Sequence, residues 1–327
     1  MRIGIIGCGL IGQKRAAAIG DDTIAVVCDS DFERARALGA RVGAEAADDW
    51  CEVTSSNVDA VIVATRHDTL APIALAAVES GKHVLVEKPA ARSLQELLPV
   101  REAARRRGVS VKAGYNHRFH PGLKKAKEIV DAGTLGPLYY IRARYGHGGR
   151  VGYDGEWRCH RAVSGGGELI DQGTHLIDLS RWFLGDLSLD YAAMPTYFWP
   201  IQVEDNCFLA LRGEQGKMAW LHATWTEWKN TFSFEITGRD GKLTIDGLGG
   251  SYGTERLTFH KMLPQMGPPD TTIWEYPSSD ASWANELAEF KAGHAGQPAS
   301  IADIDDACAV LRLIEAAYNR SVSGPTR

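Results

Sequence analysis

Short apolar runs alternate with amphipathic segments from the start of the chain to Ala113. The runs have the length of buried strands, and the segments between them repeat their apolar positions with helical spacing. The expected strands are Ile3–Ile6, Ile24–Cys28, Ala60–Ala64, His83–Val86 and Val109–Ala113. The expected helices pass through Ala16–Ala18, Phe32–Leu38, Leu70–Glu79 and Leu94–Arg107. Strands that alternate with helices at this spacing predict a parallel, doubly wound sheet.

The pattern changes near Pro121. An expected helix over Leu123–Ala132 is followed by strand-like runs rich in β-branched and aromatic residues. These runs are Leu138–Tyr145, Leu189–Tyr197, Cys207–Leu211, Met218–Thr226, Ser233–Thr237, Lys242–Ile245 and Arg256–His260. They predict an open, mainly antiparallel sheet, and expected helices at Trp283–Ala292 and Ile304–Asn319 close the chain. We therefore expect an α/β domain over residues 1–120 and an α+β domain over residues 121–327, with the last helices able to pack back on the first domain.

Composition and charge agree with two domains and argue against several classes of protein. A chain of 327 residues, 44% hydrophobic and 24% charged, is too long for one ordinary core. The formal net charge of −5 gives no electrostatic reason to bind nucleic acid or an anionic membrane, and no apolar run is long enough to span a bilayer. The N-terminus lacks a signal-peptide pattern, and the six scattered cysteines contain no CxxC pair. These features predict a cytoplasmic protein with reduced thiols.

The first expected strand leads into Gly7-Cys8-Gly9-Leu10-Ile11-Gly12, a GxGxxG sequence that opens a helix. In this context the first glycine permits the turn, the second lets a pyrophosphate approach the backbone, and the third lets helix and strand pack closely. The helix N-terminus at Leu10 and Ile11 supplies backbone N–H groups and a partial positive charge for the phosphates. The first domain is therefore expected to be a Rossmann domain that binds a dinucleotide.

Asp29, at the end of the second expected strand, bears on the choice of dinucleotide. A carboxylate at this position accepts hydrogen bonds from the ribose hydroxyls and disfavours a 2′-phosphate, which predicts NAD. Arg34 and Arg36 lie close by in the sequence and keep NADP as an alternative. The competing interpretation is that Asp29 only caps the next helix.

Polar residues follow three more expected strands. The segments are Thr65-Arg66-His67, Glu87-Lys88-Pro89 and Tyr115-Asn116-His117-Arg118. Because the carboxyl ends of parallel strands meet at one edge of a sheet, we expect the nicotinamide there. The predicted cofactor contacts at this edge are Thr65, Arg66, His67, Glu87, Lys88 and Asn116. The competing interpretation of Glu87-Lys88-Pro89 is a solvated turn with an ion pair.

One helix of the second domain carries candidate chemistry, within SGGGELIDQGTHLIDLSRWFLGD. At 100° per residue its apolar positions cover one broad arc, opposite a polar stripe of Glu168, Asp171, His175 and Asp178. Asp171 and His175 are i, i+4 neighbours, so the carboxylate can orient the imidazole, and the preceding glycines can admit a ligand. The stripe also fits a solvated polar face. A zinc site formed by His117, His120, Asp171 and His175 is a weak alternative, because the spacing matches no tetrahedral motif.

Together these motifs resemble the Gfo/Idh/MocA family of oxidoreductases. The resemblance rests on GCGLIG, on Glu87-Lys88-Pro89 after a strand and on Asp171-Gln172-Gly173-Thr174-His175, and it extends over nearly the whole chain. It implies that Lys88 lies beside the nicotinamide and the reacting hydroxyl, with Glu87 holding the lysine or the cofactor and Pro89 fixing the turn. It also implies that Asp171 and His175 act on the same substrate. The chain departs from the family pattern at Arg66-His67, where many relatives carry Pro-Asn, and at Leu70, where they carry histidine.

The resemblance implies an NAD(P)-dependent oxidoreductase acting on a secondary hydroxyl or ketone of a sugar, inositol or nucleotide sugar. His175 suits proton transfer at neutral pH, and Lys88 can stabilise the developing alkoxide. Aromatic rings and arginines near the polar stripe suit a polyhydroxylated substrate. The predicted substrate contacts are Lys88, Tyr115, Arg144, Trp157, Arg158, Asp171 and His175, with Arg150 and Tyr153 in the same segments.

Two other functions remain open. One is an NAD-dependent glycosidase of the same fold, and the other is a dinucleotide-binding sensor without catalysis. The open sheet of the second domain also predicts a homodimer or homotetramer formed through that sheet.

Overall fold

The structure is a computed structural model that describes residues 1–294, 297 and 300–320. Its residues fall into two compact units by proximity. Unit 1 contains Met1–Asn116 and Trp283–Leu311, and unit 2 contains His117–Ser282 and the segment that starts at Arg312. The boundary expected between residues 120 and 121 stays a prediction, because proximity does not show which part of a chain folds on its own.

Unit 1 is built on a six-stranded parallel sheet with the order β3-β2-β1-β4-β5-β6. Its strands are β1 (Arg2–Ile6), β2 (Thr23–Cys28), β3 (Glu45–Ala47), β4 (Ala60–Val63), β5 (His83–Glu87) and β6 (Val111–Gly114). The side chains of β4 are fully buried, as expected for a strand covered by helices on both faces. The predicted doubly wound sheet is confirmed, except that β3 was not foreseen, because its sequence Glu-Ala-Ala shows neither alternation nor β-branching.

The helices of this sheet are α1 (Leu10–Ala17), α2 (Phe32–Val42), α3 (Trp50–Ser55), α4 (His67–Glu79) and α5 (Leu94–Arg107). The bounds of α5 are those predicted, because Ser93 caps its first turn by accepting from the N–H of Glu96 and Gly108 ends it with φ 66°. The helix α4 begins at His67, before the expected start at Leu70, because its first turn is polar. Trp283–Leu311 adds most of α9 (Ser282–His294) and the first part of α10 (Ile304–Arg320) to unit 1.

Unit 2 is built on an eight-stranded sheet with the order β14-β13-β12-β11-β7-β10-β9-β8. Its strands are β7 (Leu138–Gly146), β8 (Leu187–Ala193), β9 (Asn206–Gly213), β10 (Met218–Thr224), β11 (Thr231–Gly238), β12 (Gly241–Asp246), β13 (Glu255–Lys261) and β14 (Asp270–Tyr276). All neighbours are antiparallel except β7 and β10, so the expected mainly antiparallel sheet is confirmed. The strand β14 was not foreseen, because it is largely exposed and lacks an apolar face.

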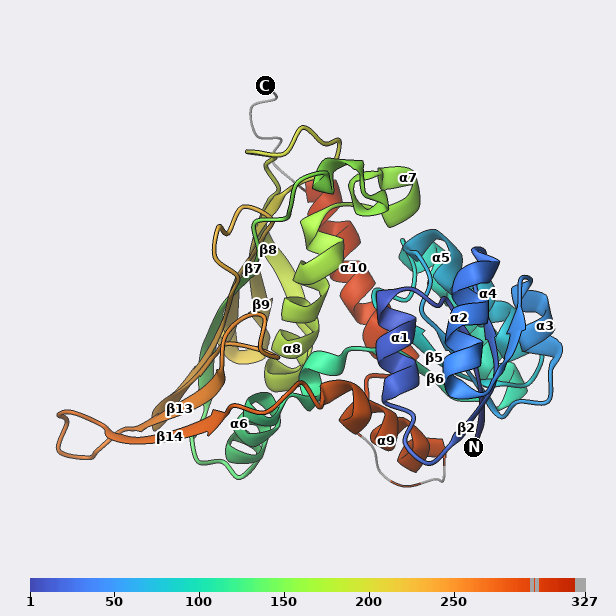
Figure 1. The fold of residues 1–327 in the computed structure, drawn as a ribbon. Coiled ribbons are helices and arrows are strands. Elements are labelled where there is room, and N and C mark those ends of the chain that lie inside the picture. The colour runs from blue at the N-terminus through green and yellow to red at the C-terminus, as the bar shows by residue number, and fades with distance from the viewer. Residues whose placement is uncertain (295–296, 298–299, 321–327) are drawn as a thin grey trace. The chain divides into compact units, whose positions relative to one another are not determined.

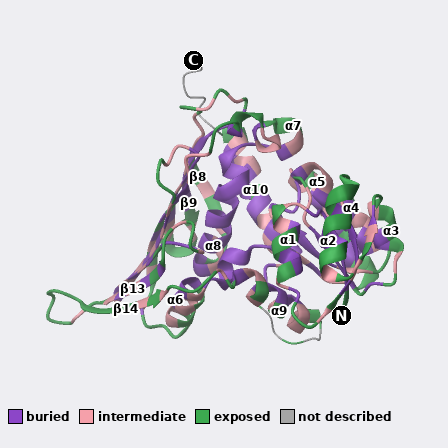
Figure 2. Cartoon of the chain, viewed as in Figure 1, coloured by how far each residue is buried: buried purple, intermediate pink, exposed green. Residues whose placement is uncertain are grey.

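Helices cover one face of this sheet. The helix α8 (Thr174–Leu184) packs on β7 and β10, and α6 (Pro121–Asp131) packs on β12, β13 and β14. Figure 1 shows α8 running along the sheet, and Figure 2 shows that nearly all of α8 is buried. Short turns of helix complete the unit: η1 (Asn116–Phe119), η2 (Tyr153–Gly155), η3 (Trp157–Cys159), α7 (Arg161–Ser164), η4 (Leu169–Gly173) and η5 (Glu214–Gly216). Within the described part of the chain, no helix combines the length and the apolar character needed to cross a membrane.

Candidate active site

The glycine loop after β1 has the geometry needed to receive a pyrophosphate. Gly7 adopts φ +98°, and a Cβ on Gly12 would lie 1.8 Å from the carbonyl oxygen of Gly7, so both positions require glycine. A Cβ on Gly9 would meet no heavy atom within 4 Å, so this side of the loop is open. Leu10, the first residue of α1, is 73% exposed. The loop therefore fits the dinucleotide that its sequence predicts.

Asp29 is bonded to the backbone on both sides. One carboxylate oxygen accepts from the N–H of Cys8 at 2.7 Å, and the other accepts from the N–H of Asp31 at 2.9 Å. Asp31 is the N-cap residue of α2, so Asp29 links the glycine loop to the start of that helix. Its side chain remains partly exposed at the end of β2. The role of Asp29 toward ribose stays a prediction, and its support of the loop is an additional function.

Glu87, the last residue of β5, belongs to a buried ion-pair network. The guanidinium of Arg15 is fully buried; its Nε donates to Glu87 at 2.6 Å and its Nη1 contacts Glu286 at 2.5 Å. Burial alone would lower the pKa of Arg15, but Glu286 and Glu87 outweigh this effect and raise it. The ring of Trp283 lies 4.6 Å from the same guanidinium. The interpretation of this strand end as a solvated turn is therefore wrong.

Lys88 follows directly and is partly exposed, whereas Pro89 and Ala90 are buried. The Lys88–Pro89 peptide bond is cis. Because Glu87 is held by Arg15, the backbone that carries Lys88 is fixed on one side by an interior contact. The expected contact of Glu87 with the lysine or the cofactor stays a prediction.

The other residues predicted at this edge follow β4 and β6. The hydroxyl of Thr69 donates to that of Thr65 at 2.9 Å, while Arg66 is exposed and pairs with Asp68. His67 is buried at the start of α4. Asn116 and Tyr115 are also buried, and Tyr115 has no exposed surface in this structure. The contacts of these residues with cofactor or substrate stay predictions.

In unit 2, the turn that carries Asp171 is held by a buried carboxylate. The Oε1 atom of Glu204 accepts from the N–H groups of Gly167 at 3.0 Å and Leu169 at 3.1 Å, and from the hydroxyl of Tyr318 at 2.7 Å. Burial raises the pKa of Glu204, while these donors act in the opposite sense. The segment then forms the π-helical turn η4, which runs directly into α8. Such turns often mark functional sites in helices.

The glycines before this turn are needed for packing within the protein. A Cβ on Gly166 would lie 1.8 Å from the hydroxyl of Tyr318, and a Cβ on Gly167 would lie 2.0 Å from the carbonyl oxygen of Glu204. Gly165 ends α7 in a left-handed conformation, with φ 84°. The expectation that these glycines admit a ligand is wrong at Gly166 and Gly167, because protein atoms already occupy that space.

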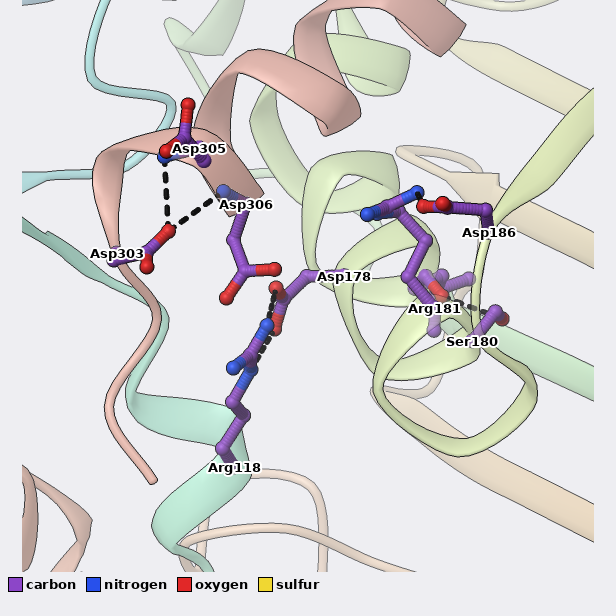
Figure 3. A network of polar contacts seen from close by, with 9 residues as sticks. Arg118, Asp178, Ser180, Arg181, Asp186, Asp303, Asp305 and Asp306 are labelled. Atoms are coloured by element: carbon purple, nitrogen blue, oxygen red, sulfur yellow. Dashed lines mark hydrogen bonds and ion pairs between the residues drawn. The ribbon is translucent and has the colours of Figure 1, made fainter. Parts of the chain in front are cut away.

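The polar stripe is buried along its whole length. Glu168 and Asp178 are exposed by 0% and 1%, and Asp171 and His175 by 7% and 5%. The interpretation of the stripe as a solvated face is therefore wrong. Asp178 receives two hydrogen bonds from the guanidinium of Arg118, at 2.8 and 2.5 Å, in the paired arrangement seen in Figure 3. This contact fastens η1 to α8.

Asp171 has its own cationic partner. Its carboxylate lies 3.3 Å from Nε of Arg158, whose guanidinium lies 4.6 Å from the ring of Trp157. Burial would lower the pKa of Arg158, but the charge of Asp171 is the strongest effect that raises it, and the pKa ends above its usual value. Three of the predicted substrate contacts, Trp157, Arg158 and Asp171, therefore lie together. The expected orientation of His175 by Asp171 stays a prediction.

Other predicted substrate contacts lie elsewhere in unit 2. Arg144 is exposed on β7, and because side chains alternate along a strand it points away from the face of Tyr145, which lies beside His175. We leave Arg144 out of the proposed substrate contacts for this reason. Arg150 is exposed and pairs with Glu156, and Tyr153 belongs to a buried hydrophobic cluster.

Several contacts around the polar stripe were not predicted. His117 stacks on His175, Tyr145 lies beside both rings, and Tyr252 contacts Tyr145 with the ring centroids 5.0 Å apart. The Gln172 side chain donates to the Tyr252 hydroxyl at 3.0 Å. The sequence places His117 after a strand and in the zinc alternative. It contains no local pattern that predicts the stacking of His117 on His175, which lies 58 residues further along the chain. In the described ranges 1–294, 297 and 300–320, no three His, Cys, Asp or Glu side chains are placed to hold a metal ion.

Comparison with known proteins defines the class. The description "Oxidoreductase family, NAD-binding Rossmann fold" matches residues 1–115, and "GFO/IDH/MocA C-terminal domain" matches residues 123–244. Together with the sheet order and the glycine loop, these matches define an NAD-binding oxidoreductase. The chain belongs to the Gfo/Idh/MocA family. The predicted family and the predicted cofactor NAD are thereby confirmed.

Three relatives illustrate what the chain is similar to. D-glucoside 3-dehydrogenase of Escherichia coli (strain K12) is 25% identical over 349 residues, covering 99% of this chain and 96% of that protein. Inositol 2-dehydrogenase 2 of Saccharopolyspora erythraea is 34% identical over 194 residues, covering 57% of this chain and 54% of that protein. The solved structure of levoglucosan dehydrogenase with NADH and levoglucosan gives a TM-score of 0.86 at 22% identity and covers 98% of both chains. This last similarity shows a common fold.

Proposed function

We propose that the protein oxidises a secondary hydroxyl of a sugar, inositol or nucleotide sugar with NAD, or reduces the corresponding ketone. The observation that carries the proposal is the buried polar stripe with Arg158 and Trp157 beside it. Burying four ionisable side chains along one helix is costly unless partners or function compensate. Arg118 compensates Asp178 and Arg158 compensates Asp171. His175 is the group of the stripe best suited to exchange a proton at neutral pH.

The proposed division of labour follows from the chemistry of alcohol oxidation. NAD, when bound, accepts the hydride. His175 takes the hydroxyl proton, and Lys88 stabilises negative charge on the same oxygen. The negative charge of Asp171, partly neutralised by Arg158, stabilises the positive charge that His175 gains with the proton. Gly9, Asp29 and the residues after β4, β5 and β6 bind and orient the cofactor.

The substrate class is proposed from two lines of support. The named relatives are dehydrogenases of a glucoside and of inositol. In this chain, Trp157 offers an aromatic face and Arg158 offers hydrogen-bond donors next to Asp171. Aromatic faces pack on sugar rings, and guanidinium groups bind hydroxyls, carboxylates or phosphates.

A screen of sugars, inositols and nucleotide sugars for NADH fluorescence tests the proposal. We expect net NADH formation with at least one member and release of the matching ketone. Turnover with glycosidic bond cleavage and no net NADH would instead establish the glycosidase alternative, because that reaction regenerates its cofactor. NAD binding without turnover across the whole library would favour the sensor alternative.

Cofactor preference, assembly and location are part of the same proposal. Asp29 favours NAD over NADP, and Arg34, which pairs with Asp31, keeps NADP as the alternative. Tyr191 and Trp220 stack on the uncovered sheet face with exposed fractions of 45% and 52%, which supports assembly of a homodimer or homotetramer through this sheet. Six free cysteines support a reducing, cytoplasmic location.

A further inference from the structure

His117 and His175 stack face to face in unit 2. Their ring centroids lie 3.7 Å apart and their planes are inclined by 18°. Both side chains are buried, with exposed fractions of 6% and 5%. The contact joins two elements that are remote in the sequence, because His117 lies in η1 and His175 in the first turn of α8. A ring laid flat on another limits the rotation of its neighbour.

Other rings hold the stack from the side. Tyr145 lies 5.3 Å from His117 and 6.3 Å from His175, measured between centroids. His120 and Phe232 meet His117 edge-on at 5.5 and 6.0 Å. The stack is therefore a packed feature of the core. A change in charge on either ring takes place where water cannot easily compensate for it.

The charged groups around the stack are largely paired with one another. Asp171 pairs with Arg158 and Asp178 with Arg118, and the ring nitrogens of His120 lie 3.1 Å from Glu255 and 3.8 Å from Asp280. The other titratable groups of the packed elements are Glu168, Tyr145, His147, Cys207 and Tyr252. Burial raises the pKa of Tyr145 and Cys207, raises that of Tyr252 to about 12, and lowers that of His147. The side chains of Tyr145, His147, Cys207 and Tyr252 are therefore neutral at neutral pH. They do not offset the positive charge of a proton taken up by the stack.

Two charged imidazoles in this geometry would repel each other. At 3.7 Å and an effective dielectric of about 20, adding the second proton is disfavoured by on the order of three pH units. A charged ring on a neutral ring is favourable, because a cation is attracted to an aromatic face. The stack therefore accepts one proton readily and resists the second.

A second histidine pair in the same protein provides a comparison. His83 and His294 of unit 1 lie 4.3 Å apart in an edge-on arrangement. Burial first, and then the neighbouring charge of His294, lower the pKa of His83. The stacked pair in unit 2 is closer and more deeply buried, so its coupling is expected to be stronger.

We propose that His117 is a positioning residue that fixes the ring plane of His175 and shares one proton with it. The inference deepens the proposed function and rests on it for the role of His175 as base. In alcohol oxidation, the O–H proton passes to the His175 ring while the C–H hydride leaves for NAD, which turns the alcohol into a ketone. The proton then resides on either ring until it is released to solvent. When it resides on His117, His175 remains neutral, so activity extends to lower pH than an isolated His175 would allow.

The test is an NMR titration of histidine-labelled protein without cofactor or substrate. In the wild type we expect His175 to titrate in two steps separated by roughly three pH units, because the second proton meets the first. His117→Phe keeps a flat ring against His175 but removes the second proton site, so His175 should titrate in one full step. The reciprocal variant His175→Phe should leave His117 with one full step, and it provides the test if His117→Phe does not fold. A wild-type His175 that titrates in one step, like the variant, would overturn the proposal.

Steady-state kinetics adds a second readout once a substrate is known. The acid limb of kcat/KM should shift upward by roughly one to three pH units in His117→Phe, with kcat at the plateau within about threefold of the wild type. His83→Phe is the matched control, since it removes one member of the other histidine pair, and it should leave the profile unchanged. An unshifted limb in His117→Phe would contradict proton sharing. The titration needs no turnover, so a failure of the proposed function remains distinguishable from a failure of this inference.

Discussion

In unit 1 the cofactor loop is shaped by backbone geometry, whereas in unit 2 the candidate proton-transfer residues are buried side chains held by other buried side chains. Gly7 and Gly12 lie where any side chain would clash, and Gly9 leaves open space. His175 and Asp171 instead depend on His117, Arg158 and the turn fixed by Glu204. Backbone-built sites bind a constant chemical group, such as a pyrophosphate. Side-chain-built sites can set charge and select among substrates.

The largest expected effects concern the two residues proposed to handle the hydroxyl proton. Lys88→Ala and His175→Ala should each lower kcat by roughly 10²–10⁴-fold while the protein stays folded. Lys125→Ala, which removes a partly exposed lysine of α6 that pairs with Glu128, is the control and should keep wild-type turnover. Steady-state kinetics and circular dichroism on purified variants give the comparison. Wild-type kcat in either active-site variant would remove that residue from the mechanism.

The glycine loop allows binding to be separated from stability. Gly9→Ala has room in the structure, so its free energy of unfolding should stay within about 0.5 kcal/mol of the wild type. Its methyl group would nevertheless occupy the side where the pyrophosphate approaches, and the Kd for NAD should rise by roughly 100-fold. Gly12→Ala places a Cβ against the Gly7 carbonyl and should weaken both folding and binding. Isothermal titration and urea unfolding measure the two quantities, and equal behaviour of the variants would contradict the assignment.

Asp29 tests cofactor choice. A hydrogen bond to a charged group contributes about 1.5–3 kcal/mol, so Asp29→Ala should raise the Kd for NAD by roughly 10- to 150-fold and narrow its advantage over NADP. Part of this loss comes from the N–H groups of Cys8 and Asp31, which lose their acceptor. Asp29→Asn keeps an acceptor for one of these two N–H groups and is the partial control for that loss. If the wild type prefers NADP, or the alanine variant binds NAD normally, Asp29 supports the loop and nothing more.

The smallest expected effect concerns Glu204 in unit 2. Removing its acceptor in Glu204→Ala leaves buried donors without a partner and should lower the free energy of unfolding by about 1–3 kcal/mol. The pKa of Glu204 is raised in the folded state, so the folded protein binds this proton more tightly than the unfolded chain. The contribution of Glu204 to stability is therefore complete below its ordinary value of 4.5 and declines as the pH rises through the raised value.

Glu204→Gln keeps an oxygen acceptor but cannot ionise. It should stay close to the wild type at low pH and lose less stability than the wild type as the pH rises. Urea unfolding at several pH values compares the wild type with the alanine and glutamine variants. If the free energy of unfolding depends on pH in the same way for the wild type and the glutamine variant, the raised pKa of Glu204 does not contribute to the pH dependence of stability.

Local motifs made unit 1 largely predictable. The glycine loop is contiguous, and α5 is delimited by a cap at Ser93 and a glycine at position 108, so neighbouring residues contain the information. The departures there are short or polar elements, such as β3, whose formation depends on pairing with β2. A three-residue strand has too few positions to show a period.

The polar stripe of unit 2 shows what a single sequence does not contain. The predicted helix forms, although its first turn η4 is π-helical instead of α-helical, and periodicity does not say what covers a face. Arg118 and Asp178 are separated by 60 residues in the sequence, and Glu204 and Gly167 by 37 residues. No local sequence pattern therefore predicts either contact. The sequence likewise predicts that the glycines before η4 leave room for a ligand, but Tyr318 and Glu204 fill that space.

Isotope transfer in a single turnover tests the central claim most directly. The best substrate from the library, carrying deuterium on the carbon that bears the reacting hydroxyl, is mixed with excess enzyme and NAD, and the cofactor is analysed by mass spectrometry. The account predicts one deuterium transferred to the nicotinamide for each ketone formed, with transfer slowed by roughly 10²–10⁴-fold in Lys88→Ala and His175→Ala. Product formation without deuterium in the cofactor, or unchanged transfer rates in both variants, would contradict it.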